Sequence, residues 1–320
     1  MTTRRALPLE IAAVWLLFIC FASAVFVTYS RTPPSQLYHY SGSGLAGGAG
    51  RVLTWSNFPM ALVAIVVLAF LADRLSSGRV TAIALVGVAL CAAVFWPGVV
   101  DQGDLDPKAV NVIAAAGVLI ALVLTAVALR QGIIRSGKRA GDRIRLAVAA
   151  VALFVGLPWI AAELGFFLTG VPGLNRLFLT GEYVDHPRYV GEDIAHHAIY
   201  TPAVHHGSHH GMDGVLLLLA AVLLSRVVPS VRRSRLRVAT GLYLALMVAY
   251  AVGNIANDAW IEQVVKRGWT SWEIPEMYRP SLTVAWGVIA VGAAALYAAS
   301  VWWSRRSPRE RVTLRAVAGA

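Results

Sequence analysis

The stretch Lys108–Arg130, KAVNVIAAAGVLIALVLTAVALR, decides the fold class of this chain. Between its two terminal cations it carries no charged residue, and it is long enough to cross about 30 Å of hydrocarbon as a helix. A helix is favoured because a segment in lipid must satisfy its own backbone hydrogen bonds. The whole chain shares this character, since 58% of its 320 residues are hydrophobic and only 14% are charged. The composition predicts an all-α integral membrane protein.

Similar apolar runs recur along the chain and predict a polytopic transmembrane helical bundle of about eight spans. Little sequence lies outside them, so residues 1–320 are expected to form a single integral membrane domain. The first run, followed by Ala22-Ser23-Ala24, also resembles a cleavable signal peptide, but it continues through Val27 and favours a retained span. The predicted spans cover about 8–29, 54–74, 80–100, 108–130, 144–169, 212–228, 238–258 and 281–303.

The distribution of the cations predicts the topology of these spans. The formal net charge is +11, and with a cytoplasmic N-terminus and alternating spans most of the 28 Lys and Arg fall on the cytoplasmic side. The largest groups lie in 130–145, 226–237 and 305–315. This pattern predicts that both termini are cytoplasmic, in a plasma (inner) membrane. The basic charge is explained by anionic lipid headgroups, so no nucleic-acid partner is expected.

The long connections fall on the extracytoplasmic side, at about 30–53, 170–211 and 259–280. The first is rich in Gly and Ser and is expected to be flexible. The second holds seven of the eight histidines, between His186 and His210. Imidazole is the commonest protein ligand of transition metals, and folding alone does not require so many in one loop. The loop therefore predicts an extracytoplasmic His/carboxylate metal site.

The densest part of the loop suggests which side chains bind the ion. If the next helix begins near Ala203, residues three and four positions apart share one face. Two histidines one turn apart can then present two nitrogens to one ion. The two stripes predicted in this way are His206, His210 and Asp213, and His205, His209 and Asp213.

A second set of candidate ligands lies upstream in the same loop. Glu192 and His196 are four residues apart, and so are Asp193 and His197. A carboxylate and an imidazole from this segment, facing two imidazoles from the next, would form a mixed nitrogen and oxygen site for Fe, Zn or Cu. The number of ligands also allows two metal ions.

Acidic residues within the predicted spans could complete the site. Glu163 lies in the fifth span, where an ionisable group is costly and indicates function. Asp258 lies near the outer end of the seventh span, on one face with Asn254 and Glu262. Glu163 and Asp258 are candidates for a catalytic general base or for a partner of a metal ligand. The alternative is structural: a protonated Glu163 bonded to a neighbouring helix, and interhelical polar packing at Asn254 and Asp258.

The sequence His206-Gly207-Ser208-His209-His210 resembles the HxxHH box of membrane di-iron desaturases and hydroxylases. The resemblance covers this short stretch alone and implies oxygen chemistry. That family spreads its histidine boxes over separate cytoplasmic segments, whereas here the histidines lie in one loop that is predicted to be extracytoplasmic. We therefore treat the match as a shared motif and not as family membership.

Three functions are compatible with these features. The favoured one is a metal-dependent membrane enzyme, an oxidoreductase or hydrolase acting on a lipid-like or amphipathic substrate. The second is a non-catalytic metal acceptor, a transporter, or an assembly factor of a respiratory enzyme. The third is a membrane scaffold subunit whose histidines respond to pH.

Overall fold

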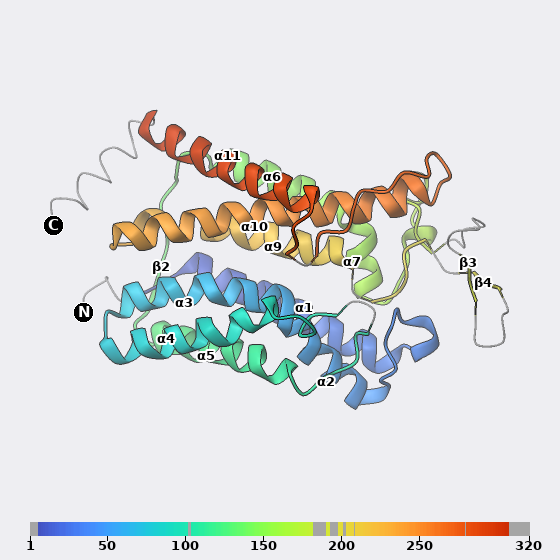
Figure 1. Cartoon of the computed structure of the whole chain (residues 1–320), viewed down its shortest axis with the longest axis horizontal. Coiled ribbons are helices and arrows are strands. Elements are labelled where there is room, and N and C mark those ends of the chain that lie inside the picture. Colours follow the sequence, from blue (N-terminus) through green and yellow to red (C-terminus); the bar gives the residue numbers. More distant parts are fainter. Residues whose placement is uncertain are drawn as a thin grey trace.

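Figure 1 shows the computed structural model of the chain, an elongated bundle whose long helices run roughly parallel to one axis. The structure describes residues 6–101, 104–181, 190–192, 198–200, 203–207, 209–278 and 280–306. The beginning of α1 and the end of α11 lie at the same end of the bundle. The prediction of an all-α fold is confirmed, because the regular structure of the described residues is helical apart from two very short strand pairs.

The longer helices form the body of the bundle, and shorter elements connect them. The α-helices are α1 (Leu9–Arg31), α2 (Gly44–Trp55), α3 (Ala61–Leu75), α4 (Gly78–Cys91), α5 (Asn111–Leu129), α6 (Asp142–Val155), α7 (Leu157–Glu163), α8 (Leu174–Leu177), α9 (His210–Leu224), α10 (Ser234–Trp260) and α11 (Val284–Arg306). The 3₁₀ helices are η2 (Pro34–Gln36), η4 (Ala92–Phe95), η5 (Leu168–Gly170) and η6 (Val228–Ser230), and the π-helices are η3 (Ser56–Met60) and η7 (Ile261–Val265). Strand β1 (Leu7–Pro8) pairs in parallel with β2 (Ile133–Ile134), and β3 (Val190–Glu192) pairs antiparallel with β4 (Ala198–Tyr200).

Within the described residues, six helical stretches are long and apolar enough to cross a membrane. They are 9–31, 44–75, 78–95, 111–129, 234–265 and 284–304. The pair α6 and α7 gives a seventh candidate, bent by 60° at Gly156, just before Pro158, a residue that cannot donate a backbone hydrogen bond. Helix α9 has only 15 residues, about 22 Å at 1.5 Å per residue, which is shorter than a typical span. The count of eight spans stays a prediction.

The expectation of a flexible loop is wrong for residues 44–53, because α2 occupies them and continues through the π-helix η3 into α3. Pro59 lies inside η3, where its missing N–H accounts for the irregular turn. A Cβ at Gly48 would overlap Ser30 Oγ and lie 2.5 Å from the carbonyl oxygen of Phe26 in α1. The glycines that suggested flexibility therefore permit close packing of α2 on α1.

Helix α9 lies at the centre of the bundle and packs against α1, α6 and α10. Its residues Val215, Leu216 and Leu224 have no exposed surface. A Cβ at Gly214 would lie 2.7 Å from the carbonyl oxygen of Ala251, so the glycine lets α10 approach closely. As a result the first turn of α9 is held inside the bundle, together with the histidine that precedes it.

We expect Gly48→Val to weaken the contact between α1 and α2, because a branched side chain would overlap the α1 backbone. Overpacking of this kind costs about 1–3 kcal/mol. The measurement is the thermal unfolding midpoint in detergent, and Gly287→Val in α11 is the control because nothing lies within 4 Å of a Cβ at Gly287. Equal losses in the two variants would contradict close packing at Gly48.

Candidate metal centre

His209, Asp258 and Glu262 form a group that could hold a metal ion. Each offers one ligand atom, and these atoms all lie within 4.8 Å of one another. His209 and Glu262 are buried, and Asp258 is partly buried. In the described part of the chain this is the one group of three or more His, Cys, Asp or Glu side chains with such spacing.

Two helices bring these residues together. Asp258 lies near the end of α10 and Glu262 in the π-helix η7 that continues it, so the two carboxylates are about one turn apart on one side. His209 is the residue just before α9 and has extended backbone angles, φ −125° and ψ 147°. Its imidazole contacts Glu262 and does not follow the face of α9.

The hydrogen bonds of His209 fix the tautomer of its ring. Nε2 lies 2.9 Å from the carbonyl oxygen of His205, which can only accept, so Nε2 carries a hydrogen. Nδ1 lies 3.0 Å from Oε1 of Glu262. This nitrogen can hold either a proton or a metal ion, and orientation of a ligating imidazole through its other nitrogen is common in metal sites.

Without a metal, the proton on Nδ1 is strongly held. Burial lowers the pKa of His209, but the charge of Glu262 and its hydrogen bond outweigh burial and raise the pKa to about 9. The ring is then an imidazolium paired with a buried carboxylate.

Both carboxylates are oriented by donors from other elements. Oε2 of Glu262 accepts a hydrogen bond of 2.5 Å from Nε1 of Trp159 in α7. Oδ2 of Asp258 accepts one of 2.5 Å from the backbone amide of Gly211 in α9. A Cβ at Gly211 would overlap the Trp159 ring, so the glycine is required for this arrangement. The three ligands and their partners fit a bound metal ion.

The other histidines predicted as ligands have different surroundings. The helix begins at His210 and not near Ala203, so the predicted stripes do not form. His206 pairs with Leu37 in an isolated β-bridge, and its ring stacks on Phe167 with centroids 4.1 Å apart. The condition of a helix start near Ala203 is not met, because Gly207, with φ 96°, adopts a left-handed conformation outside the helix.

His205 and His210 stack on neighbouring rings. The ring of His205 lies between Tyr38, at 4.7 Å, and His209, at 4.0 Å. Burial lowers the pKa of His205, and the nearby His209 lowers it further. His210 stacks on Tyr278 with centroids 5.4 Å apart. Neither belongs to the metal-binding group, but His205 supports it through its carbonyl oxygen and its stacking.

The predicted acids fall in separate places. Asp213 accepts a hydrogen bond of 3.0 Å from Trp55 Nε1 and belongs to a neighbouring pocket. Glu163 is buried at the end of α7, where its backbone carbonyl accepts a hydrogen bond from Thr28, and it is not part of the group. Glu192 lies in β3, but its side chain is not described, and His196 and His197 lie outside the described residues.

Glu262 is the member of this group that was not predicted as a site residue from the sequence. Its spacing of four from Asp258 was visible in the sequence and placed it on the same helix face. The pairing with His209 was not visible, because it depends on where α9 begins and on how α9 crosses α10.

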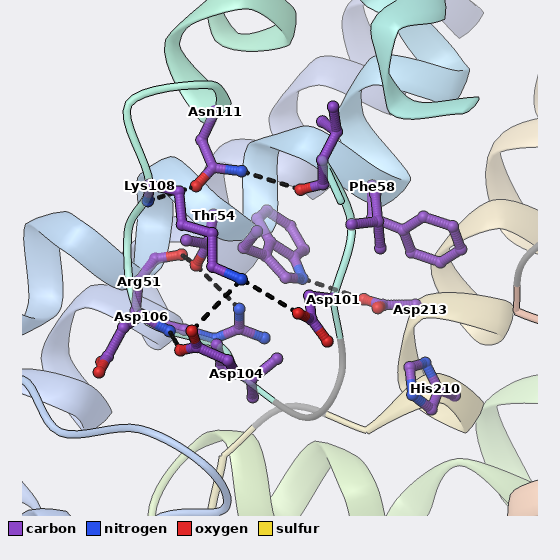
Figure 2. Close-up of a pocket in the computed structure, with 14 residues that line it drawn as sticks. Arg51, Thr54, Phe58, Asp101, Asp104, Asp106, Lys108, Asn111, His210 and Asp213 are labelled. Atoms are coloured by element: carbon purple, nitrogen blue, oxygen red, sulfur yellow. Dashed lines mark hydrogen bonds and ion pairs between the residues drawn. The ribbon is translucent and has the colours of Figure 1, made fainter. Parts of the chain in front are cut away.

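A polar pocket borders the first turn of α9 on another side (Figure 2). It encloses about 480 Å³, its open side included, and Arg51, His210 and Asp213 are among its lining residues. Lys108 Nζ lies 3.0 Å from Asp101 and 3.3 Å from Asp104 at its rim. The pocket therefore has charged groups of both signs next to His210 and Asp213.

An apolar fissure of about 890 Å³, its open side included, adjoins this pocket. Phe58 and Val100 line both spaces. The fissure lies between α3 and η4 on one side and α10 and α11 on the other, and its wall includes Tyr278, the residue that stacks on His210. The two spaces thus share part of their walls, and one is mainly apolar whereas the other has charged groups.

No family model, curated protein or solved structure matches this chain. Its function is therefore inferred from its own residues, of which the group His209, Asp258 and Glu262 and the two adjoining spaces are the most informative.

The raised pKa of His209 makes the stability of the metal-free protein depend on pH. The pKa of His209 is about 9 in the folded chain, against an ordinary value of 6.5. The pairing with Glu262 therefore contributes its full stabilisation of the folded chain below about pH 6.5, and this stabilisation is lost as the pH rises through about 9. We expect the thermal midpoint in detergent, with chelator present, to fall between pH 7 and 10.

Glu262→Gln should remove the part of this decrease in the thermal midpoint that comes from the pairing, because the imidazolium of His209 loses its carboxylate partner. Glu276→Gln is the control, because Glu276 is an exposed carboxylate in the segment that follows η7. An unchanged pH slope in Glu262→Gln would show that the pairing does not contribute.

Proposed function

We propose that this chain is a metal-dependent integral membrane enzyme that binds one transition metal ion through His209, Asp258 and Glu262. The observation that supports the proposal is that each of the three side chains has a hydrogen-bond partner that orients it toward the others. One imidazole with two carboxylates suits Zn²⁺ or Fe²⁺, whereas Cu(I) prefers sulfur ligands. A bound ion would supply Lewis acidity or redox chemistry, for hydrolysis or oxidation.

The substrate class follows from the two adjoining spaces. A molecule with an apolar chain would place it in the fissure beside Leu62 and Leu246. Its polar end would then lie in the pocket near Arg51, His210 and Asp213. Binding sites of this kind combine an apolar wall with a few polar groups that fix orientation. The enzyme would thus act on a lipid-like or amphipathic substrate that enters from the membrane.

A second candidate is a non-catalytic metal acceptor. One observation favours it: His209, Asp258 and Glu262 are not among the residues that line the polar pocket. Catalytic metal sites keep an open coordination position, whereas closed sites are structural or serve storage. Metal binding without turnover of any amphipathic substrate would support this candidate over the enzyme.

Metal content tests the first step of the proposal. Untagged protein purified in detergent and reconstituted with Zn²⁺ or Fe²⁺ should retain about one equivalent by mass spectrometry. Glu262→Gln and Asp258→Asn should each lower the affinity for the metal at least tenfold, because a neutral amide replaces one of the two charged carboxylate ligands. His206→Ala should retain the metal, since His206 stacks on Phe167 and lies outside the group. Loss in His206→Ala with retention in Glu262→Gln would overturn the assignment.

The fissure is tested separately with a photoreactive fatty acid. The probe should label residues of the fissure wall, such as Phe95 and Trp286. Leu246→Trp should reduce labelling several-fold because it fills the fissure. Leu242→Trp is the control: it lies one turn earlier on α10, is 44% exposed and does not line the fissure. Equal labelling in both variants would argue against a substrate chain in the fissure.

A further inference from the structure

A second large groove lies at the end of the bundle opposite the metal-binding group. It is bounded by the start of α10, the end of α9, the segment before α6 and the end of α11, and it encloses about 1270 Å³, its open side included. Most of its wall is apolar, with Leu244, Val248 and Leu296 among the lining residues. This is the end at which the distribution of cations predicts the cytoplasm.

Three arginines and no carboxylates are found among the described residues that line the groove. Arg145 is held in place by hydrogen bonds to Ser225 Oγ, at 2.9 Å, and to the carbonyl oxygen of Ala140, at 2.8 Å. Arg237 is held by the carbonyl oxygen of Val231, at 2.7 and 3.0 Å. The guanidinium groups are thus positioned by the protein before any ligand binds.

The third arginine, Arg139, has a buried Nε atom with no hydrogen-bond partner among the described residues. A buried donor of a charged group without an acceptor is costly. The side chain of Arg139 also lines the groove, where an anion would supply a counter-charge to its guanidinium group. Asp142, the nearest carboxylate along the chain, is paired with Arg145 and Arg226 and does not line the groove.

The groove also has the length of one membrane leaflet. From Arg237 to Val248 it follows α10 for about 16 Å at 1.5 Å per residue. Half of the hydrocarbon core of a bilayer is about 15 Å thick. The arginines lie just before α6, in the first turns of α6 and at the beginning of α10, so the cations mark the headgroup end and the apolar wall follows the acyl chains.

We propose that this groove binds one diacyl phospholipid with an anionic headgroup. The phosphate lies against Arg139, Arg145 and Arg237, and the acyl chains lie along the apolar wall between α9, α10 and α11. Basic pockets between transmembrane helices on the cytoplasmic side are typical sites for anionic headgroups. A peptide or helix with an apolar surface would supply no counter-charge to Arg139 and Arg237, so charge complementarity favours the lipid. This site is independent of the proposed metal centre.

The test uses the full chain, delipidated in detergent, and measures lipid binding by native mass spectrometry. Phosphatidylglycerol should bind with one tightly retained molecule, and phosphatidylcholine of the same chain length should bind at least tenfold more weakly. Phosphatidylglycerol should also raise the thermal midpoint. Inorganic phosphate should not raise it at matched concentration, because it lacks the acyl chains.

The variants separate the headgroup contact from the acyl contact. Arg139→Gln should weaken phosphatidylglycerol binding about five-fold, the effect of one cation near a membrane surface. It should weaken phosphatidylcholine binding less, because the choline cation already offsets the charge of the phosphate. Arg143→Gln is the matched control, since Arg143 is an exposed residue in the first turn of α6 and does not line the groove. Val248→Phe should weaken both lipids by narrowing the groove.

Thermal unfolding without lipid shows whether each variant keeps its fold. Equal binding of the two lipids, equal effects of Arg139→Gln and Arg143→Gln, or stabilisation by inorganic phosphate alone would each overturn the proposal. A folded Val248→Phe that binds phosphatidylglycerol as the parent does would also overturn it.

Discussion

The arrangement of the metal-binding group depends on Gly211, in the first turn of α9. Its backbone amide donates to Asp258, and the absence of a side chain admits the ring of Trp159, whose indole donates to Glu262. Gly211 therefore determines how closely both α10 and α7 approach the first turn of α9. His209 lies two residues before it, so its position is fixed by the same contacts.

The packing that holds this turn in place comes from small residues and not from burial of apolar surface alone. Lipid chains are as apolar as leucine, so helices in a membrane associate through close contact and hydrogen bonds. Gly214 allows the backbone of α10 to approach α9 closely, and Gly48 allows α2 to approach α1 in the same way. Polar groups such as Trp55 and Asp213 add hydrogen bonds between helices where the backbones approach. The buried centre of the bundle can thus hold charged residues in fixed positions.

The sequence predicted the class of fold because apolar length and cation distribution are properties of single segments. It selected His209 as a metal ligand and Asp258 as a candidate base or supporting residue, but not their grouping with Glu262, because that grouping depends on how two helices cross. The spacing of His206 and His210 suggested a helical stripe, whereas the left-handed Gly207 ends that pattern and α9 starts at His210. Asp258 was selected for its place in a span, and Glu262 was visible only as its neighbour on one face. The glycines of α2 were read as flexible because composition alone does not distinguish a loop from a close helix contact.

The charges at the centre are compatible with either a proton or a divalent ion on Nδ1 of His209. With both carboxylates ionised, Asp258 and Glu262 carry two negative charges in a largely buried place, and an imidazolium at His209 neutralises only one of them. Lys266 donates to the carbonyl oxygen of Ala203 nearby, so part of the remaining charge is balanced from the next segment of the chain. A divalent ion on Nδ1 would supply two positive charges and leave the ring neutral. The His205 carbonyl would still accept from Nε2, so the same hydrogen bonds that hold the proton also prepare the site for the metal.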